Sequence, residues 1–105
     1  MVIPRRPDRI IPTMRYKLIS VDGTNIFELR DGARLLVGRA PSSDVPIIDP
    51  TISRRHAEIA VRAGLCLIRD LDSCNGTLLN GRLVGRARLR RGDVLVLGET
   101  VVRVR

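Results

Sequence analysis

A chain of 105 residues has room for one domain, and its 44% apolar fraction is enough to bury a hydrophobic core. Its 19 Lys and Arg residues against 11 Asp and Glu residues give a net charge of +8, carried almost entirely by arginine. This excess favours an anionic partner, namely nucleic acid, an acidic lipid or a phosphorylated peptide, although a merely soluble basic surface is also compatible with it.

Membrane, secreted and metal-binding classes find no support in the chain. No window approaches the roughly 18 uninterrupted apolar residues of a membrane span. The first residues lack the apolar run of a signal peptide, so we expect a cytoplasmic protein. Cys66 and Cys74 are the only cysteines and show no zinc-ligand spacing, so we expect neither a metal nor a cofactor.

The first half of the chain begins with a tail and continues with short strands. Residues 1–14 contain three prolines and three arginines, which predicts a loose tail, and we expect the folded domain over 15–105. Alternation of apolar and polar residues, interrupted by Gly, Pro and Asp turn signals, predicts extended segments at 15–20, 24–29, 34–37 and 45–48.

The second half contains the two clearest hairpins. Runs at 57–62 and 65–70 flank Ala63-Gly64, and runs at 94–97 and 100–104 flank Gly98-Glu99. Short strands about 8–12 residues apart, with no sustained helical period, predict an all-β sandwich or barrel.

The stretch from 52 to 81 concentrates the polar motifs. Ser53-Arg54-Arg55-His56 is followed by Ser73-Cys74-Asn75-Gly76-Thr77 and then by Asn80-Gly81. Both Asn-Gly pairs are turn signals because Asn and Gly tolerate positive φ. Only Thr77 to Leu79 separates them, which we interpret as too short for an ordinary hairpin strand. We therefore expect a shaped loop here, and shaped loops on rigid strands often carry binding residues.

Gly38-Arg39, Ser53-x-x-His56, Asn75-Gly76-Thr77 and Asn80-Gly81 occur in this order. The pattern resembles the forkhead-associated (FHA) domain family, and the likeness extends from about Tyr16 to Arg105. The resemblance implies a β-sandwich of about eleven strands whose loops at one end bind phosphothreonine peptides without catalysis.

Five residues are the candidates for phosphopeptide binding. A phosphate dianion needs charge-assisted donors that are fixed before it arrives, and Arg39 offers a forked guanidinium. By resemblance, Ser53 and Arg54 also contact the phosphate, while the amide group of Asn75 suits the peptide backbone. Cys74 stands where the family often has Thr, and a thiol is a poor donor, so this contact is expected to be weakened.

The other motif residues are expected to shape the loops. Gly38 permits close backbone approach or an unusual φ. We interpret His56 as a hydrogen-bonding brace for the Ser53 loop rather than a general base, and Arg55 as solvent-facing. Loop architecture is also assigned to Gly76, Thr77, Asn80 and Gly81. A cluster of arginines is expected to form one solvated face that helps to attract acidic peptides: Arg82, Arg86, Arg88, Arg90 and Arg91.

Other interpretations are weaker. Arg39 could form a surface ion pair with Asp44 or Asp49. An enzyme needs a nucleophile, a base and an orienting group, and no such set is evident, so we expect no catalysis. A nucleic-acid-binding β-domain is the runner-up because of the charge, but single-strand binders stack bases on aromatic residues, and the chain has only Tyr16 and Phe27.

We therefore predict a monomeric, phosphothreonine-dependent adaptor in Ser/Thr kinase signalling. Its partner is expected to be a threonine-phosphorylated protein, either a kinase or a kinase substrate. The identity of the partner and its preferred residues around the phosphothreonine stay open, with Thr51 and Arg82 as candidates for lining the pocket of a flanking residue.

Overall fold

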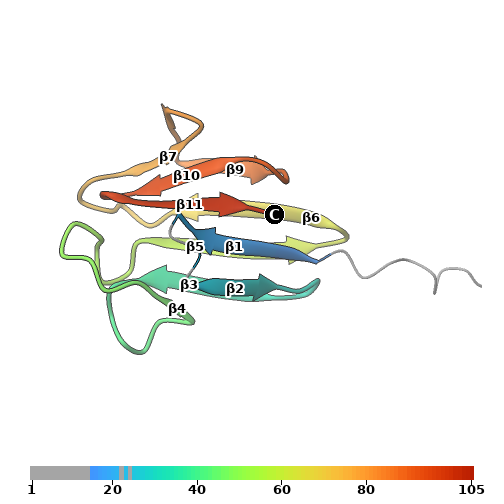
Figure 1. Ribbon diagram of the computed structural model, residues 1–105, viewed down its shortest axis with the longest axis horizontal. Coiled ribbons are helices and arrows are strands. Elements are labelled where there is room, and N and C mark those ends of the chain that lie inside the picture. The colour runs from blue at the N-terminus through green and yellow to red at the C-terminus, as the bar shows by residue number, and fades with distance from the viewer. Residues whose placement is uncertain (1–14, 22, 24) are drawn as a thin grey trace, which may run out of the picture.

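Two β-sheets pack face to face in the computed structural model, which describes residues 15–21, 23 and 25–105 (Figure 1). The predicted tail at 1–14 lies outside the described residues. The first sheet has six strands in the spatial order β2 (Ile26–Leu29), β1 (Tyr16–Ser20), β11 (Thr100–Val104), β10 (Val94–Leu97), β7 (Thr77–Leu79) and β8 (Arg82–Leu83). The second sheet has five strands in the order β4 (Val45–Pro46), β3 (Arg34–Gly38), β5 (Ala57–Arg62), β6 (Leu65–Asp70) and β9 (Arg86–Leu89). The predicted all-β sandwich of about eleven strands is confirmed.

The core lies between the sheets because buried and more exposed residues alternate along the strands, most regularly in β5 and β6. In β5, Ala57, Ile59 and Val61 are each no more than 1% exposed, and the residues between them face away from the core. The antiparallel partner β6 buries Cys66 and Ile68 in the same way. Each fully buried aliphatic side chain stabilises the fold by about 1.5–3 kcal/mol. A one-residue slip in register would turn these side chains to solvent, so the alternation also fixes the strand pairing.

Two tight turns use left-handed backbone conformations. Ala63 and Gly64, at φ 50° and 79°, join β5 to β6 as the sequence predicts. Asn80 and Gly81, at φ 50° and 86°, join β7 to β8. The expectation that Thr77 to Leu79 is too short for a strand is therefore wrong. This segment pairs with β10 on one side and β8 on the other, so hydrogen-bond ladders on both edges compensate for its length.

The arginines of the C-terminal third do not share one face, contrary to the sequence-based expectation. Arg86 and Arg88 point outward from β9 in the five-stranded sheet, whereas Arg82 belongs to β8 in the other sheet. The guanidinium of Arg91 stacks over the Tyr16 ring at 4.5 Å from its centroid, a cation–π contact. Sequence proximity alone did not reveal this division between sheets.

No helix in residues 15–21, 23 and 25–105 is long and apolar enough to cross a membrane.

Candidate functional site

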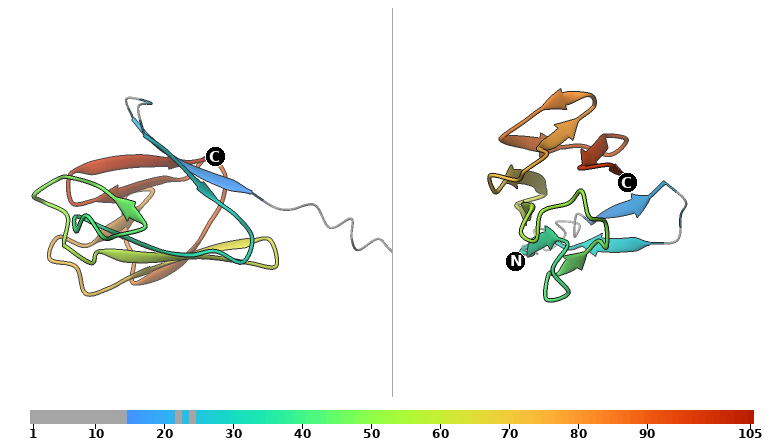
Figure 2. Two further views of the ribbon diagram at one scale, coloured as in Figure 1. Left: turned by 90° about the horizontal axis from the view of Figure 1, so that it is seen from below. Right: turned by 90° about the vertical axis from the view of Figure 1, so that its left-hand side faces the viewer.

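Three loops meet at one end of the sandwich, the left-hand end in Figure 1, which the right-hand view of Figure 2 looks upon. They comprise residues 39–44 after β3, 47–56 before β5 and 71–76 after β6. The ladder pairs Val37 with Ala57 and Ala57 with Asp70, which brings the ends of these strands side by side. The five predicted phosphopeptide-binding residues all lie on these loops.

Arg39 is held against the 47–56 loop by its backbone and its side chain. Its amide donates to the Ser53 carbonyl at 3.0 Å, and its Nε donates to the Ile52 carbonyl at 2.9 Å. This leaves the two terminal nitrogens of the guanidinium available. Within the described part of the chain, Arg39 forms no ion pair, so the alternative of a pair with Asp44 or Asp49 is not found. The orientation of this side chain is thus set before any ligand is present.

Gly38 allows two backbones to approach closely. A Cβ at this position would lie 2.0 Å from the Arg54 carbonyl oxygen, well inside any permitted contact. The same carbonyl accepts a hydrogen bond from the Ala40 amide at 3.3 Å. Gly38 does not have positive φ. Of the two reasons for glycine that the sequence left open, close approach is the one that applies.

His56 connects two of the loops from a fully buried position, at 0% exposure. Its Nδ1 accepts a hydrogen bond from the Ser53 amide at 3.1 Å, so the ring proton lies on Nε2, which donates to the Gly76 carbonyl at 2.9 Å. These contacts fit the predicted brace. They do not fit a general base, because the Ser53 group that bonds to the imidazole is the amide and not the hydroxyl.

Ser53 and Cys74 form a second connection between the same loops. The Cys74 amide donates to the Ser53 Oγ at 2.9 Å, while the Cys74 thiol is free and exposed. Asn75 is exposed and donates from Nδ2 to the Thr51 carbonyl at 2.8 Å. Direct hydrogen bonds therefore link Arg39, Ser53 and Cys74, while Asn75 is held to the same 47–56 loop through Thr51. The exposed Arg54 is adjacent to Ser53 in the chain.

Sequence reasoning missed Asp70, which organises the 71–76 loop. Its carboxylate accepts hydrogen bonds from the Ser73 hydroxyl at 2.6 Å, the Thr77 hydroxyl at 2.7 Å and the Ser73 amide at 3.1 Å. Burial acts to raise the pKa of Asp70, but these hydrogen bonds and nearby His56 outweigh it and lower the pKa below its usual value. The spacing Asp-x-x-Ser is a local turn signal that could have indicated this role.

Asp49 has the same function in the 47–56 loop. It accepts hydrogen bonds from the Thr100 hydroxyl and from the Thr51 hydroxyl and amide, and these lower the pKa of Asp49. The Thr51 Oγ1 in turn accepts from the Glu99 amide at 2.8 Å. The loop is thereby attached to the turn between β10 and β11. The Asp49-Pro50-Thr51 turn is visible in the sequence, but its link to Thr100, 51 residues away, is not.

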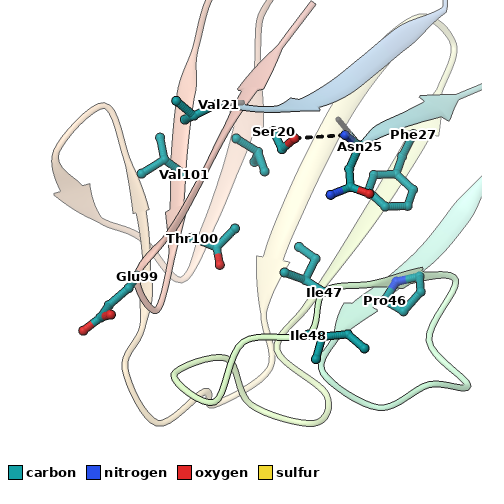
Figure 3. Close-up of a pocket in the computed structure, with 11 residues that line it drawn as sticks. Ser20, Val21, Asn25, Phe27, Pro46, Ile47, Ile48, Glu99, Thr100 and Val101 are labelled. Carbon is teal, nitrogen blue, oxygen red and sulfur yellow. Dashed lines mark hydrogen bonds between the residues drawn. The ribbon is translucent and has the colours of Figure 1, made fainter. Parts of the chain in front are cut away.

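Two cavities border the loops. The larger, of about 590 Å³, is an apolar groove whose lining includes Phe27, Ile47, Ile48 and Val101 (Figure 3). None of the five predicted binding residues lines it. The other, of about 530 Å³, includes Cys74 and Asn75 in its wall. Thr51 and Arg82, the candidates for a flanking-residue pocket, line neither cavity.

The arrangement is suited to binding rather than to bond-making chemistry. Its polar groups are engaged in holding the three loops together, with the terminal nitrogens of Arg39 and the side chain of Arg54 available to an anion. Among the residues that the structure describes, no group of three or more His, Cys, Asp or Glu side chains could hold a metal ion.

These features define a β-sandwich binding module with a cationic, hydroxyl-bearing cluster at one end. The family model of the FHA domain matches residues 35–98. The chain belongs to the FHA domain family, which confirms the resemblance noted in the sequence.

Similar proteins support this assignment. The chain is 37% identical over 79 residues to the FHA domain-containing protein FhaA of Mycobacterium tuberculosis, an alignment that covers 75% of this chain and 15% of FhaA. It is 39% identical over 71 residues to the glycogen accumulation regulator GarA of Mycolicibacterium smegmatis, covering 68% and 45% of the two chains. The chain also superposes on a structure solved in a structural and functional analysis of phosphothreonine-dependent FHA domain interactions. The TM-score is 0.81 at 35% sequence identity, and the superposition covers 87% of this chain and 95% of the other. The chain thus spans less than half the length of these two curated relatives.

Proposed function

We propose that this domain is a cytoplasmic, monomeric adaptor that binds a threonine-phosphorylated segment of a Ser/Thr kinase or its substrate. The residues assigned to binding are Arg39, Ser53, Arg54, Cys74 and Asn75. One observation carries the proposal: the guanidinium of Arg39 and the hydroxyl of Ser53 lie on two loops that are bonded to each other, with no carboxylate paired to Arg39 in the described chain.

The phosphate is the centre of the proposed interaction. The terminal nitrogens of Arg39 suit two phosphate oxygens, because a guanidinium presents its donors in a planar fork. The Ser53 Oγ already accepts from Cys74, which leaves its own proton to donate to a third oxygen. Arg54 is exposed and adds a second positive charge. At roughly 1.5–3 kcal/mol for each charged contact, less ordering costs, the expected affinity is micromolar, or roughly −8 kcal/mol.

Asn75 is assigned to the peptide backbone. Its Nδ2 is anchored on the Thr51 carbonyl, so the orientation of the amide group is fixed and Oδ1 is left to accept a hydrogen bond from a peptide N–H. Cys74 contributes less. Its amide is occupied by Ser53, and only its exposed thiol is left to reach the ligand.

Fluorescence anisotropy with three matched peptides tests the proposal. A phosphothreonine peptide, chosen by screening an oriented library, should bind at micromolar concentration, while its unphosphorylated form should not bind. The phosphoserine form should bind at least about fourfold more weakly, because burial of the threonine methyl is worth about 0.8 kcal/mol or more. Equal affinity for the phosphorylated and plain peptides would refute the proposal.

The competing nucleic-acid function is measured in the same assay with a labelled single-stranded oligonucleotide. Tyr16 is only 4% exposed, and Phe27 is half-buried in the wall of the apolar groove, so the two aromatic residues do not form an exposed row on which successive bases could stack. Oligonucleotide binding should therefore be weak and steeply dependent on salt. Tighter binding to the oligonucleotide than to the phosphopeptide would favour the competing function.

A further inference from the structure

The outward surface of the five-stranded sheet carries a group of arginines, here called the outer basic face. It consists of Arg34 on β3, Arg62 on β5, Arg69 on β6, and Arg86 and Arg88 on β9. All five are exposed, since strand alternation directs them away from the buried residues of the same strands. None of them belongs to the loops of the proposed phosphopeptide site.

Strand register arranges these side chains in rows across the sheet. One row consists of Arg34, Ala60, Leu67 and Arg88, so two apolar side chains lie between two arginines. The neighbouring row contains Glu58, Arg69 and Arg86. A groove of about 310 Å³ runs along these rows, lined by four of the five arginines, by Glu58 and by apolar side chains that include Ala60 and Leu67, with Arg88 outside its lining.

The charge on this face is not balanced. Glu58 is the single carboxylate directed outward from these strands, and it pairs with Arg69 at 3.5 Å. Within the described part of the chain the other four arginines form no ion pair. Arg69 and Arg86 lie directly opposite each other, and like charges in that position destabilise a sheet. An anionic partner would relieve this repulsion.

The apolar side chains on this face indicate which kind of anionic partner it can bind. Leu67 is 36% exposed and Leu65, on the same face, is 39% exposed, so a partner that covers them gains apolar burial. The two aromatic side chains of the chain, Tyr16 and Phe27, lie on β1 and β2 of the other sheet, so this face offers nucleic-acid bases no stacking platform. Carboxylates flanked by aliphatic side chains match the face better than a nucleic acid does.

We propose that the outer basic face binds an acidic, aliphatic segment of a protein in extended conformation, without any need for phosphorylation. Arginine suits this role because its guanidinium pairs with carboxylates through two parallel hydrogen bonds. Arg34 is the first residue of β3 and Arg39 follows its last residue, so the two lie five residues apart, which corresponds to about 17 Å along an extended chain. This surface is therefore separate from the proposed phosphopeptide site and does not depend on it.

The test uses a fluorescein-labelled peptide of alternating Glu and Leu, about eight residues long so that an extended chain crosses the face. Binding is measured for the unaltered chain, for Arg34→Glu/Arg88→Glu, and for Lys17→Glu/Arg103→Glu. Lys17 and Arg103 are exposed residues on the other sheet. Each double variant replaces two cations by two carboxylates, so both change the net charge equally. The first variant should bind at least about tenfold more weakly, and the second should stay within about twofold of the unaltered chain.

Three results would overturn the proposal: no measurable binding of the Glu-Leu peptide, an equal loss in both variants, or oligothymidylate binding that is as tight and falls in parallel. A cooperative urea unfolding transition like that of the unaltered chain shows that Arg34→Glu/Arg88→Glu is folded. If it does not fold, Arg34→Gln/Arg88→Gln replaces it with the same expected direction. Arg39→Ala should leave Glu-Leu binding within about twofold, so failure of the phosphopeptide proposal would not affect this result.

Discussion

The backbone amide of Cys74 donates a hydrogen bond to the side-chain oxygen of Ser53 over 2.9 Å, across 21 residues of sequence. This bond makes the Ser53 hydroxyl part of the framework of the site as well as a candidate donor to the ligand. It also restricts the directions open to the hydroxyl proton, because one lone pair of the oxygen is occupied.

Ser53→Ala should therefore weaken phosphopeptide binding and loosen the loops together. We expect affinity to fall at least about tenfold, from loss of a hydrogen bond to a charged group, and the free energy of unfolding to fall by about 1 kcal/mol. Titration calorimetry and urea denaturation measure the two effects. Ser42→Ala, at an exposed position on the neighbouring loop, is the matched control and should change neither quantity. Unchanged phosphopeptide affinity in Ser53→Ala would remove Ser53 from the site.

Arg39→Ala should abolish phosphopeptide binding while the domain stays folded. Arg39→Lys should recover only part of the affinity, because lysine lacks both the fork and the Nε that donates to Ile52. We expect a loss of more than about thirtyfold for the alanine variant, from two charged hydrogen bonds. Arg55→Ala, at an exposed cation in the same region, is the control. A change of less than about twofold in Arg39→Ala would show that this guanidinium does not contact the phosphate.

Cys74→Thr should increase phosphopeptide affinity by about three- to tenfold. A threonine hydroxyl is a stronger hydrogen-bond donor than the exposed thiol, and the backbone bond from position 74 to Ser53 does not depend on the side chain. Cys74→Ala removes the thiol without adding a hydroxyl, and it should bind the phosphopeptide about as well as the unaltered chain does. If both substitutions have the same effect, the side chain at this position does not reach the ligand.

Gly38→Ala should destabilise the domain by about 1–3 kcal/mol, because the new Cβ would overlap the backbone carbonyl of Arg54. Gly85→Ala is the control, since its Cβ would meet nothing within 4 Å and its φ is not positive. Thermal unfolding of the two variants measures the difference. Equal melting temperatures would show that the 38–40 and 53–55 backbones can separate without loss of stability.

Asp70→Asn should remove a stabilising contribution that depends on pH. The folded-state pKa of Asp70 lies below its usual value, so its contribution is present above the ordinary carboxyl pKa near 4 and is lost as the pH falls through the folded-state pKa. The difference in unfolding free energy between the unaltered chain and Asp70→Asn should thus be constant above about pH 5 and shrink below about pH 4. Urea denaturation across this range measures it.

Asp72→Asn, which removes an exposed carboxylate from the same loop, is the matched control for Asp70→Asn. A stability difference for Asp70→Asn that persists undiminished at pH 3 would mean that the hydrogen bonds from Ser73 and Thr77 do not require the charged carboxylate.

The residue pattern was sufficient to predict the strands that pair with their neighbours in the sequence. The hairpins β5–β6 and β10–β11 have the bounds that the sequence predicts, because a two-residue turn and strict alternation fix the register between adjacent strands. Strands β7, β8 and β9 were not predicted. Their short runs are stabilised by partners elsewhere in the chain, such as β10 for β7 and β6 for β9.

The sequence by itself determined the all-β class, the family and the motif residues that the loops carry, since all of these depend on residue type and spacing. It did not give the loop bounds, because residues 45–48 were expected to be extended and β4 ends at Pro46. Only the tertiary structure decided that His56 bridges Ser53 to Gly76, that Asp49 and Asp70 anchor the loops, and that the arginines divide between two sheets. The physical reason is that a hydrogen bond between residues 20 or 51 positions apart leaves no periodic trace in the chain. It exists only once strand pairing has brought its two ends together.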